Sequence, residues 1–398
     1  MKKVNFLVVN LMLFLTVGVY GQRTETIHLT EAGTFENSFF LIEDWENPVT
    51  KLKITGNIDA RDLFYLNNFD GFSSLAELDL SEADIVEYNG QAGGPSQLHP
   101  ANTLPDNSFG WIQLNLSKII LPKTLTSIGN MVLFANYNAL CALTSLEIPE
   151  GITSIGNAFA GQQKALVTVS LPGTLTSLRD SSFIDCTGLT VIINNNPNPV
   201  DITPYSGVPC FYGVNKTKCT LYVPAGSKSL YEKASIWQEF NIIELPETTE
   251  ITETPTTDGA TIEWQPYENA EGYRLIIYSD EARTDTIYIF EFDADGEWFN
   301  TISFRSASTT LSHTIENLQR GTDYFYTLEI LGVGDVVLAS QSGEFTTASE
   351  PASIDAALAE PAEIVGYYSV SGAKLPKAPE KGAYIVLYSN DTSKKILK

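Results

Sequence analysis

A repeated leucine-rich string constrains the fold of this chain more than any other feature. Strings of the form L-x-x-L-x-L begin at Val49, Leu75, Leu116, Leu143, Leu166 and Leu189. The successive intervals are 26, 41, 27, 23 and 23 residues, and the long one predicts an inserted loop at residues 89–107, which are rich in Gly, Pro and Asn. One unit of this length cannot bury its own apolar face. The pattern therefore predicts stacked units that share a continuous core.

Each unit carries a second string with the central residues Thr-Ser. Its three copies are residues 125–129, 152–156 and 175–179. An aromatic residue then recurs as Phe134, Phe159 and Phe183. The combined pattern predicts one short strand, a turn at proline and a tighter return segment per unit, with Leu, Ile and Phe pointing inward. Cys141 and Cys186 fall on the inward positions, so we expect buried free thiols there.

These strings resemble the BspA-like leucine-rich repeats of exported Bacteroidetes proteins. The resemblance covers about 200 residues and implies a capped solenoid over residues 22–245. Residues 26–46 resemble the N-terminal cap, and residues 219–245, with Trp237, resemble the closing strand and helix. Relatives of this kind imply adhesion to host matrix or to other cells.

Residues 246–348 predict a β-sandwich, because apolar and polar residues alternate there with a period of two. Trp264, Leu318, Gly321 and Tyr324 resemble a fibronectin type III domain, in which the tyrosine bonds back to the preceding turn. Residues 293–297 resemble the start of a calcium loop. They lack its later bidentate glutamate, which favours a hairpin turn with solvated carboxylates.

The two ends of the chain predict its destination. Residues 1–21 combine a short positive start with an apolar run, which is typical of a signal peptide, although a retained anchor stays an alternative. Residues 349–398 end in a segment that resembles the C-terminal sorting domain of type IX secretion, which would make the secretion machinery a partner; a small β appendage without that role is the alternative. We expect an exported protein, extracellular or on the outer-membrane surface, with the periplasm as alternative.

Composition limits the chemistry. A net charge of -24 argues against a nucleic-acid partner, because such partners need a basic surface. The three His and four Cys show no metal-ligand spacing, so we expect no metal, no cofactor and no enzyme. A hydrolase using a carboxylate pair stays a minor alternative, since no pair stands out among 48 acidic residues. The spacing of Cys210 and Cys219 allows a disulfide, worth about 2–3 kcal/mol if unstrained.

The sequence thus predicts a mainly β chain with short helical or irregular returns: a leucine-rich-repeat solenoid, an Ig/fibronectin type III-like β-sandwich and a short β tail. We expect a binding protein whose solenoid strands present their outward residues to a host or bacterial surface protein or glycan. The outward positions are Lys118, Ile120, Ser145, Glu147, Thr168, Ser170 and Thr190. Ordinary solvated strand surface is the alternative for each residue. The alternative function is an accessory polysaccharide-binding protein of a carbohydrate-utilisation system, with the sandwich or tail binding the polysaccharide.

Overall fold

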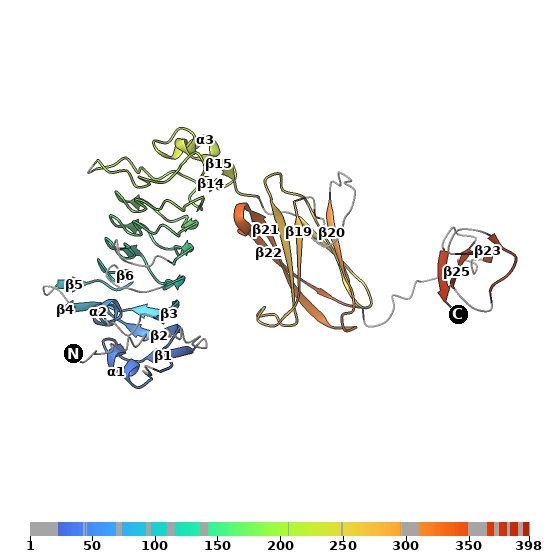
Figure 1. Ribbon diagram of the computed structural model, residues 1–398, viewed down its shortest axis with the longest axis horizontal. Helices are drawn as coiled ribbons and strands as arrows, with labels where there is room; N and C mark the ends of the chain where they lie inside the picture. The colour runs from blue at the N-terminus through green and yellow to red at the C-terminus, as the bar shows by residue number, and fades with distance from the viewer. Residues whose placement is uncertain are drawn as a thin grey trace, which may run out of the picture.

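The computed structural model is mainly β and is organised in three successive parts (Figure 1). It describes residues 23–348 except 43, 45, 69–73, 93–96, 110–115, 136–141, 206, 248–249, 295 and 297–309. In the tail it describes residues 364–369, 374–379, 383–388 and 393–397. The predicted signal peptide, Cys141 and residues 295 and 297 of the predicted calcium loop lie outside these residues.

The first part is a solenoid whose broad face consists of parallel strands. Four of them form one sheet: β1 (Thr24–Leu29), β2 (Lys51–Ile58), β3 (Glu77–Ile85) and β7 (Lys118–Ile120). Five more continue the face: β9 (Ser145–Glu147), β11 (Thr168–Leu171), β13 (Val191–Asn194), β14 (Thr220–Val223) and β15 (Asn241–Glu244). β7 lies next to β9. Each leucine-rich string predicted from the sequence therefore supplies one strand of this broad face.

The return segments form a second parallel sheet, which we call the narrow face. Its strands are β6 (Thr103–Leu104), β8 (Ser127–Ile128), β10 (Ser154–Ile155) and β12 (Ser177–Leu178). β6 lies within the segment predicted to be an inserted loop, and so does the hairpin β4 (Tyr88–Gly90) and β5 (Gln97–His99). The loop prediction was wrong at β6, because Leu104 is fully buried and pairs with Ile128. In Figure 1 the narrow face lies on the side of the solenoid away from β14 and β15.

The solenoid core is the stack of inward side chains from successive turns. Val169 pairs with Leu146 on one side and Ile192 on the other, and Ile192 pairs with Leu221. All four are buried. An aromatic stack runs beside them, with ring centroids 6.0 Å apart for Phe159 and Phe183 and 5.4 Å for Phe183 and Phe211. Stacking therefore supplies the burial that a single turn lacks.

Short helices and aromatic side chains close the C-terminal end of this core. They are α3 (Lys228–Tyr231) and the 3-10 helix η2 (Trp237–Glu239). Trp237 is buried, lies 5.5 Å from the Phe211 ring and donates a hydrogen bond to the Val200 carbonyl at 2.8 Å. Tyr231 donates to the Asn196 carbonyl at 2.7 Å. The cap therefore covers the last apolar layer and binds the irregular segment after β13.

The Cys210–Cys219 disulfide is not formed. Cys186, Cys210 and Cys219 are free and buried. The Cys210 thiol bonds to Ser182 and lies near Cys186 of the preceding turn. Burial raises the pKa of Cys210 and raises that of Cys219 to about 12, which keeps both as thiols at neutral pH. The free buried thiol predicted at Cys186 is confirmed.

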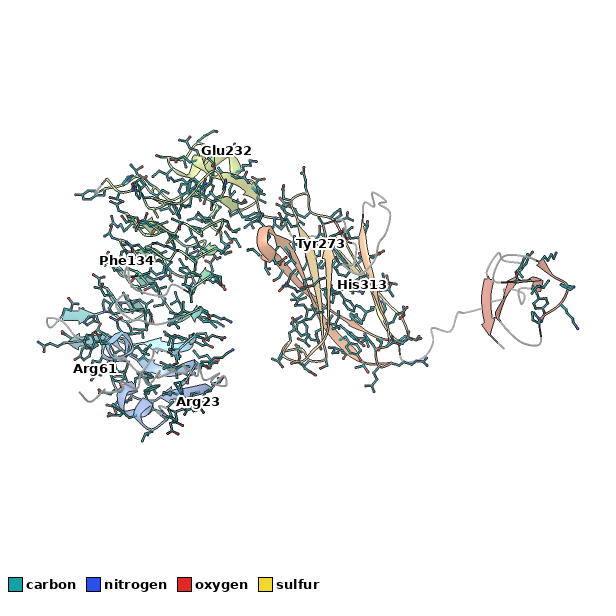
Figure 2. All side chains as sticks on the ribbon, in the orientation of Figure 1. Arg23, Arg61, Phe134, Glu232, Tyr273 and His313 are labelled. Carbon is teal, nitrogen blue, oxygen red and sulfur yellow. The ribbon has the colours of Figure 1, made fainter. Side chains whose placement is uncertain are left out.

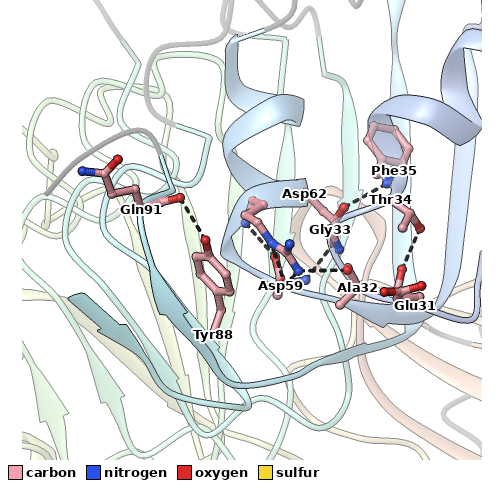
Figure 3. A network of polar contacts seen from close by, with 10 residues as sticks. Glu31, Ala32, Gly33, Thr34, Phe35, Asp59, Asp62, Tyr88 and Gln91 are labelled. Carbon is pink, nitrogen blue, oxygen red and sulfur yellow. Dashed lines mark hydrogen bonds and ion pairs between the residues drawn. The ribbon is translucent and has the colours of Figure 1, made fainter. Parts of the chain in front are cut away.

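The N-terminal cap contains α1 (Phe35–Phe40) and α2 (Ala60–Asn68). The buried Asp62 carboxylate accepts hydrogen bonds from the amides of Gly33, Phe35 and Asp59 at 2.7, 2.9 and 2.9 Å (Figure 3). Arg61 pairs with Asp59 at 2.6 Å and lies 4.5 Å from the centroid of the Tyr88 ring. These contacts join the cap to the β4–β5 hairpin.

The second part has two antiparallel sheets around its own core, and we call it the two-sheet unit. One sheet has the order β16 (Ile251–Pro255), β17 (Ala260–Trp264), β20 (Leu311–Ile315). The other has the order β19 (Thr286–Asp293), β18 (Gly272–Tyr278), β21 (Asp323–Gly332), β22 (Val336–Thr346). Trp264, Tyr273 and Tyr326 are buried between them, and Tyr273 is labelled in Figure 2.

Two local predictions fall in this unit. The Gln319 amide donates to Tyr324 Oη at 2.9 Å, which is the expected bond to the preceding turn. The Gly296 amide donates to the Asp293 carbonyl at 3.0 Å, so a tight turn follows β19. This turn connects β19 to the segment before β20.

The tail is a four-stranded antiparallel sheet. Its order is β24 (Lys374–Leu375), β23 (Ile364–Ser369), β25 (Ala383–Tyr388), β26 (Ser393–Leu397). The segment that the sequence predicted as a short β tail therefore forms four strands in the described residues.

Candidate functional site

The predicted binding residues all come from neighbouring strands of the broad face. Ser145 pairs with Thr168, and Glu147 pairs with Ser170. Lys118 and Ile120 lie on β7, where they pair with Glu77 and Asp79 of β3. Thr190 immediately precedes β13 and is exposed. The structure therefore brings the seven residues onto one face, with different neighbours along it.

The N-terminal end of the broad face is charged. Lys51 pairs with Glu77 at 2.7 Å, and Lys53 lies 2.6 Å from Glu82 and 4.0 Å from Asp79. The hydrogen bond to Glu82 raises the pKa of Lys53. These ion pairs are partly or fully exposed, so each contributes little to stability. The ion pairs give this end of the broad face alternating positive and negative charges as far as Lys118.

The C-terminal end of the broad face is apolar and covered. Val191 and Ile193 of β13 and Tyr222 of β14 point outward, yet they are buried against Leu338 of β22. Partly buried side chains around this contact are Ile243, Leu245, Tyr267, Val333 and Val336. The two-sheet unit therefore packs on the last strands of the broad face.

Polar contacts fix the same interface. Tyr267 donates its hydroxyl hydrogen to the Glu244 carbonyl, and the Val333 amide lies 3.4 Å from Tyr222 Oη. Burial raises the pKa of both tyrosines, so both stay protonated at neutral pH. The interface thus combines apolar and polar contacts, as is usual where two domains of one chain meet.

A groove opens between the two units beside this interface, and we call it the inter-unit groove. Its volume is about 810 Å³, within the range of ligand sites. Its solenoid wall is Thr144, Ser145, Leu146, Glu147, Val167, Thr168, Ser170, Ile193 and Asn195. Its other wall is residues 334–340, which include the first half of β22. Of the predicted residues, Ser145, Glu147, Thr168 and Ser170 line the groove, whereas Lys118, Ile120 and Thr190 do not.

β22 gives the groove a wall that can form main-chain hydrogen bonds with an added peptide strand. It is the outer strand of its sheet and pairs with β21 on one side. The outer strand of a sheet presents N–H and C=O groups to a further strand. Ser145 and Thr168 add hydroxyls opposite it, and Glu147 adds one carboxylate.

The sequence analysis did not predict the groove wall from residues 334–340 or the apolar end of the solenoid wall. The missed residues include Val167, which is 40% exposed, and Val336 to Ser340. One sequence pattern could have indicated that another element covers the C-terminal end of the broad face. The outward positions hold Ser, Thr and Glu in β9 and β11 but Val191 and Ile193 in β13. Apolar residues at outward positions predict a surface that another element covers.

The comparisons with known proteins agree with the repeat geometry. A family model described as BspA type leucine rich repeat region matches residues 102–234 in 6 copies. Residues 102–234 carry BspA-type leucine-rich repeats. The match begins one residue before β6, so residues 102–107, the last part of the segment predicted as an insertion, already belong to the repeat region. Among curated proteins, none matches the chain significantly in sequence.

Two solved structures are similar to the chain. One is the leucine-rich repeat protein of T. pallidum, at 15% identity and a TM-score of 0.21, covering 42% of this chain and 57% of that one. The other is the cell-surface-expressed chitinase ChiW of Paenibacillus sp. FPU-7, at 8% identity and a TM-score of 0.18. It covers 81% of this chain and 24% of that one. The chain thus spans only part of both proteins.

Neither a metal cluster nor a membrane helix occurs in the part of the chain that the structure describes. No group of three or more His, Cys, Asp or Glu side chains there is placed to hold a metal ion. None of the helices there has the length and apolar character needed to span a bilayer.

Proposed function

We propose that this protein is an exported, non-enzymatic surface or secreted protein that binds an extended segment of another protein in the inter-unit groove. The groove itself carries the proposal, because it joins the polar middle of the broad face to an outer β-strand. An extended peptide added beside β22 gains main-chain hydrogen bonds, and its side chains meet Ser145, Thr168 and Glu147. Leucine-rich repeats that present such a strand-lined surface fit a protein-interaction role.

We propose further that the two-sheet unit is a fibronectin type III-like module and that it forms part of the binding site. The strand orders β16-β17-β20 and β19-β18-β21-β22 support this, together with the bond from Gln319 to Tyr324. Export through residues 1–21 and handling of residues 349–398 by secretion machinery complete the proposal.

Binding to matrix proteins tests the proposed function. The full chain is immobilised and probed with fibronectin, fibrinogen, laminin and collagen by surface plasmon resonance. We expect saturable binding to one of them. Thr168→Trp should weaken that binding at least about tenfold, because the indole fills the groove. Thr187→Trp is the matched control, since Thr187 is exposed on the solenoid outside the groove.

Two results would count against this function. One is the absence of saturable binding to every matrix protein. The other is an equal loss of binding for both tryptophan variants, which would show that the ligand does not bind in the groove.

A further inference from the structure

A second groove lies on the narrow face of the solenoid, away from the inter-unit groove. Its volume is about 760 Å³. It is lined by Ile128, Gly129, Asn130, Ser154, Ile155, Gly156, Asn157, Ala158, Ser177, Arg179, Asp180, Ser181 and Tyr205. Its floor is therefore formed by residues of β8, β10 and β12 and by the residues that follow these strands. Nearly all its polar groups are hydroxyls, amides and planar charged groups.

A ladder of planar polar side chains runs along this groove. Asn130 donates to Asp106 through its amide nitrogen at 2.7 Å and through Nδ2 at 2.9 Å. Asn157 donates in the same way to Asn130 Oδ1, at 2.8 and 3.1 Å. Asp180 accepts from the Tyr205 amide at 3.0 Å. These bonds hold the amide and carboxylate planes in fixed orientations, one per turn, at the strand spacing of about 4.8 Å.

An aromatic ring stands at each end of the ladder. Tyr205 is 96% exposed at the Asp180 end. At the other end, Asp106 lines a different pocket, of about 370 Å³, whose wall includes Phe64, 40% exposed. The same pocket is walled by His99 and Asn67, both more than nine-tenths buried, so polar groups are held at its inner surface. At both ends, an exposed aromatic ring therefore lies beside polar groups that hydrogen bonds or burial hold in place.

The lining fits a neutral sugar chain better than other ligands. A pyranose ring has apolar C–H faces, which pack on Tyr205 and Phe64, and hydroxyls at its edge, which pair with amide, carboxylate and guanidinium groups. A pyranose residue in an extended chain is about as long as one rung of the ladder. Asp106 and Asp180, in a chain of net charge -24, repel anionic glycans and nucleic acids.

We propose that the narrow face binds a neutral polysaccharide, which lies along the ladder from the Phe64 pocket to Tyr205. The site is separate from the inter-unit groove. The protein then carries two faces, one for a protein and one for a glycan.

Affinity electrophoresis of the full chain tests the polysaccharide site. The probes are laminarin, xyloglucan, glucomannan and α-mannan, with anionic hyaluronan for comparison. We expect at least one neutral polymer to retard the chain and hyaluronan to have no effect. Tyr205→Ala should weaken the retardation roughly tenfold, as for an aromatic hot spot. Tyr212→Ala is the matched control, because Tyr212 is 57% exposed outside the groove.

Phe64→Ala tests the other end of the path and should also weaken retardation. Thr168→Trp should leave it unchanged, which separates this site from the inter-unit groove. Circular dichroism confirms that each variant is folded. The proposal is overturned if no neutral polymer retards the chain, or if Tyr205→Ala and Tyr212→Ala behave alike.

Discussion

At the residue scale, glycines allow adjacent solenoid turns to approach each other. Gly156 follows Ile155 of β10, and its amide donates to the Ile128 carbonyl at 2.9 Å. A β-carbon on Gly156 would lie 2.5 Å from the carbonyl carbon and oxygen of Gly129. Gly156, in the second copy of the string, therefore allows a closer backbone approach than a residue with a β-carbon would. Arg179 occupies this position in the third copy, where the corresponding bond to Ile155 is longer, at 3.1 Å.

Gly156→Ala should lower the free energy of unfolding of the solenoid by about 1–3 kcal/mol, since the backbone must shift to admit the methyl group. Urea unfolding measures this loss. Ser154→Ala on the same strand is the control and should stay within about 0.5 kcal/mol of the parent. Equal losses of unfolding free energy in the two variants would show that the close approach of the turns at Gly156 does not cause the destabilisation.

His313 gives the two-sheet unit a pH-dependent stability. Its ring lies 4.2 Å from the Phe290 ring and 5.1 Å from the Phe292 ring, centroid to centroid, and Figure 2 labels it in the two-sheet unit. Burial lowers the pKa of His313, so the folded state favours the neutral ring. The stabilisation is complete above the pKa of the unfolded histidine, about 6.5, and is lost as the pH falls below it.

We therefore expect β17 and β20 to exchange their amide hydrogens faster, relative to intrinsic rates, at pH 5 than at pH 7. His313→Phe should reduce this pH dependence. Peptide-resolved hydrogen exchange provides the measurement, and His28→Phe, at an exposed position, is the control. An unchanged pH dependence in His313→Phe would assign it to other groups.

At the element scale, β13 and β22 determine how the two units meet. The outward side of β13 is apolar and packs on Leu338 of β22. Each of these two strands therefore belongs both to the sheet of its own unit and to the contact between the units. The same contact places the rest of β22 opposite β9 and β11 and so forms the inter-unit groove. A change in this contact should alter the groove without unfolding either core.

Leu338→Asp should separate the units, because a carboxylate replaces a buried side chain at the centre of the contact. Small-angle X-ray scattering should then give a larger maximum dimension, while circular dichroism stays unchanged. Ile289→Asp is the control, since Ile289 is 58% exposed on β19 at the opposite edge of the sheet. An unchanged scattering curve for Leu338→Asp would mean that other contacts hold the units together.

At the scale of the whole molecule, acidity is concentrated in one part. Residues 246–348 contain 19 Asp and Glu against 4 Lys and Arg, whereas residues 349–398 contain 6 of each. The acidic two-sheet unit favours solubility and repels anionic partners. The neutral tail is distinguished from it both by charge and by its own sheet.

Deletion of residues 364–398 should shift the protein from the medium or outer membrane to the periplasm, if the tail is read by secretion machinery. Fractionation of producing cells, with immunoblotting of each fraction, measures the shift. A fluorescent protein bearing residues 1–21 and 349–398 is the converse test. Unchanged distribution after the deletion would leave the tail as a structural appendage.

The inward-facing residues of both units could be predicted from the sequence. The spacing of leucines predicted the strands of the broad face and their shared core, because inward residues contact the same positions of adjacent turns. The period-two alternation after residue 260 similarly predicted the strands with buried Trp264 and Tyr273. Such core contacts follow from a local spacing of apolar residues, which can be read directly in the sequence.

The surroundings of the outward-facing residues could be read only from the tertiary structure. Tyr222 and Val333 are in contact although 111 residues separate them, so the covering of the broad face depends on how two folded units meet. The narrow-face ladder likewise depends on the alignment of Asp106, Asn130 and Asn157 across turns. Surface residues carry no periodic constraint from a core, and their function follows from which distant segment lies opposite them.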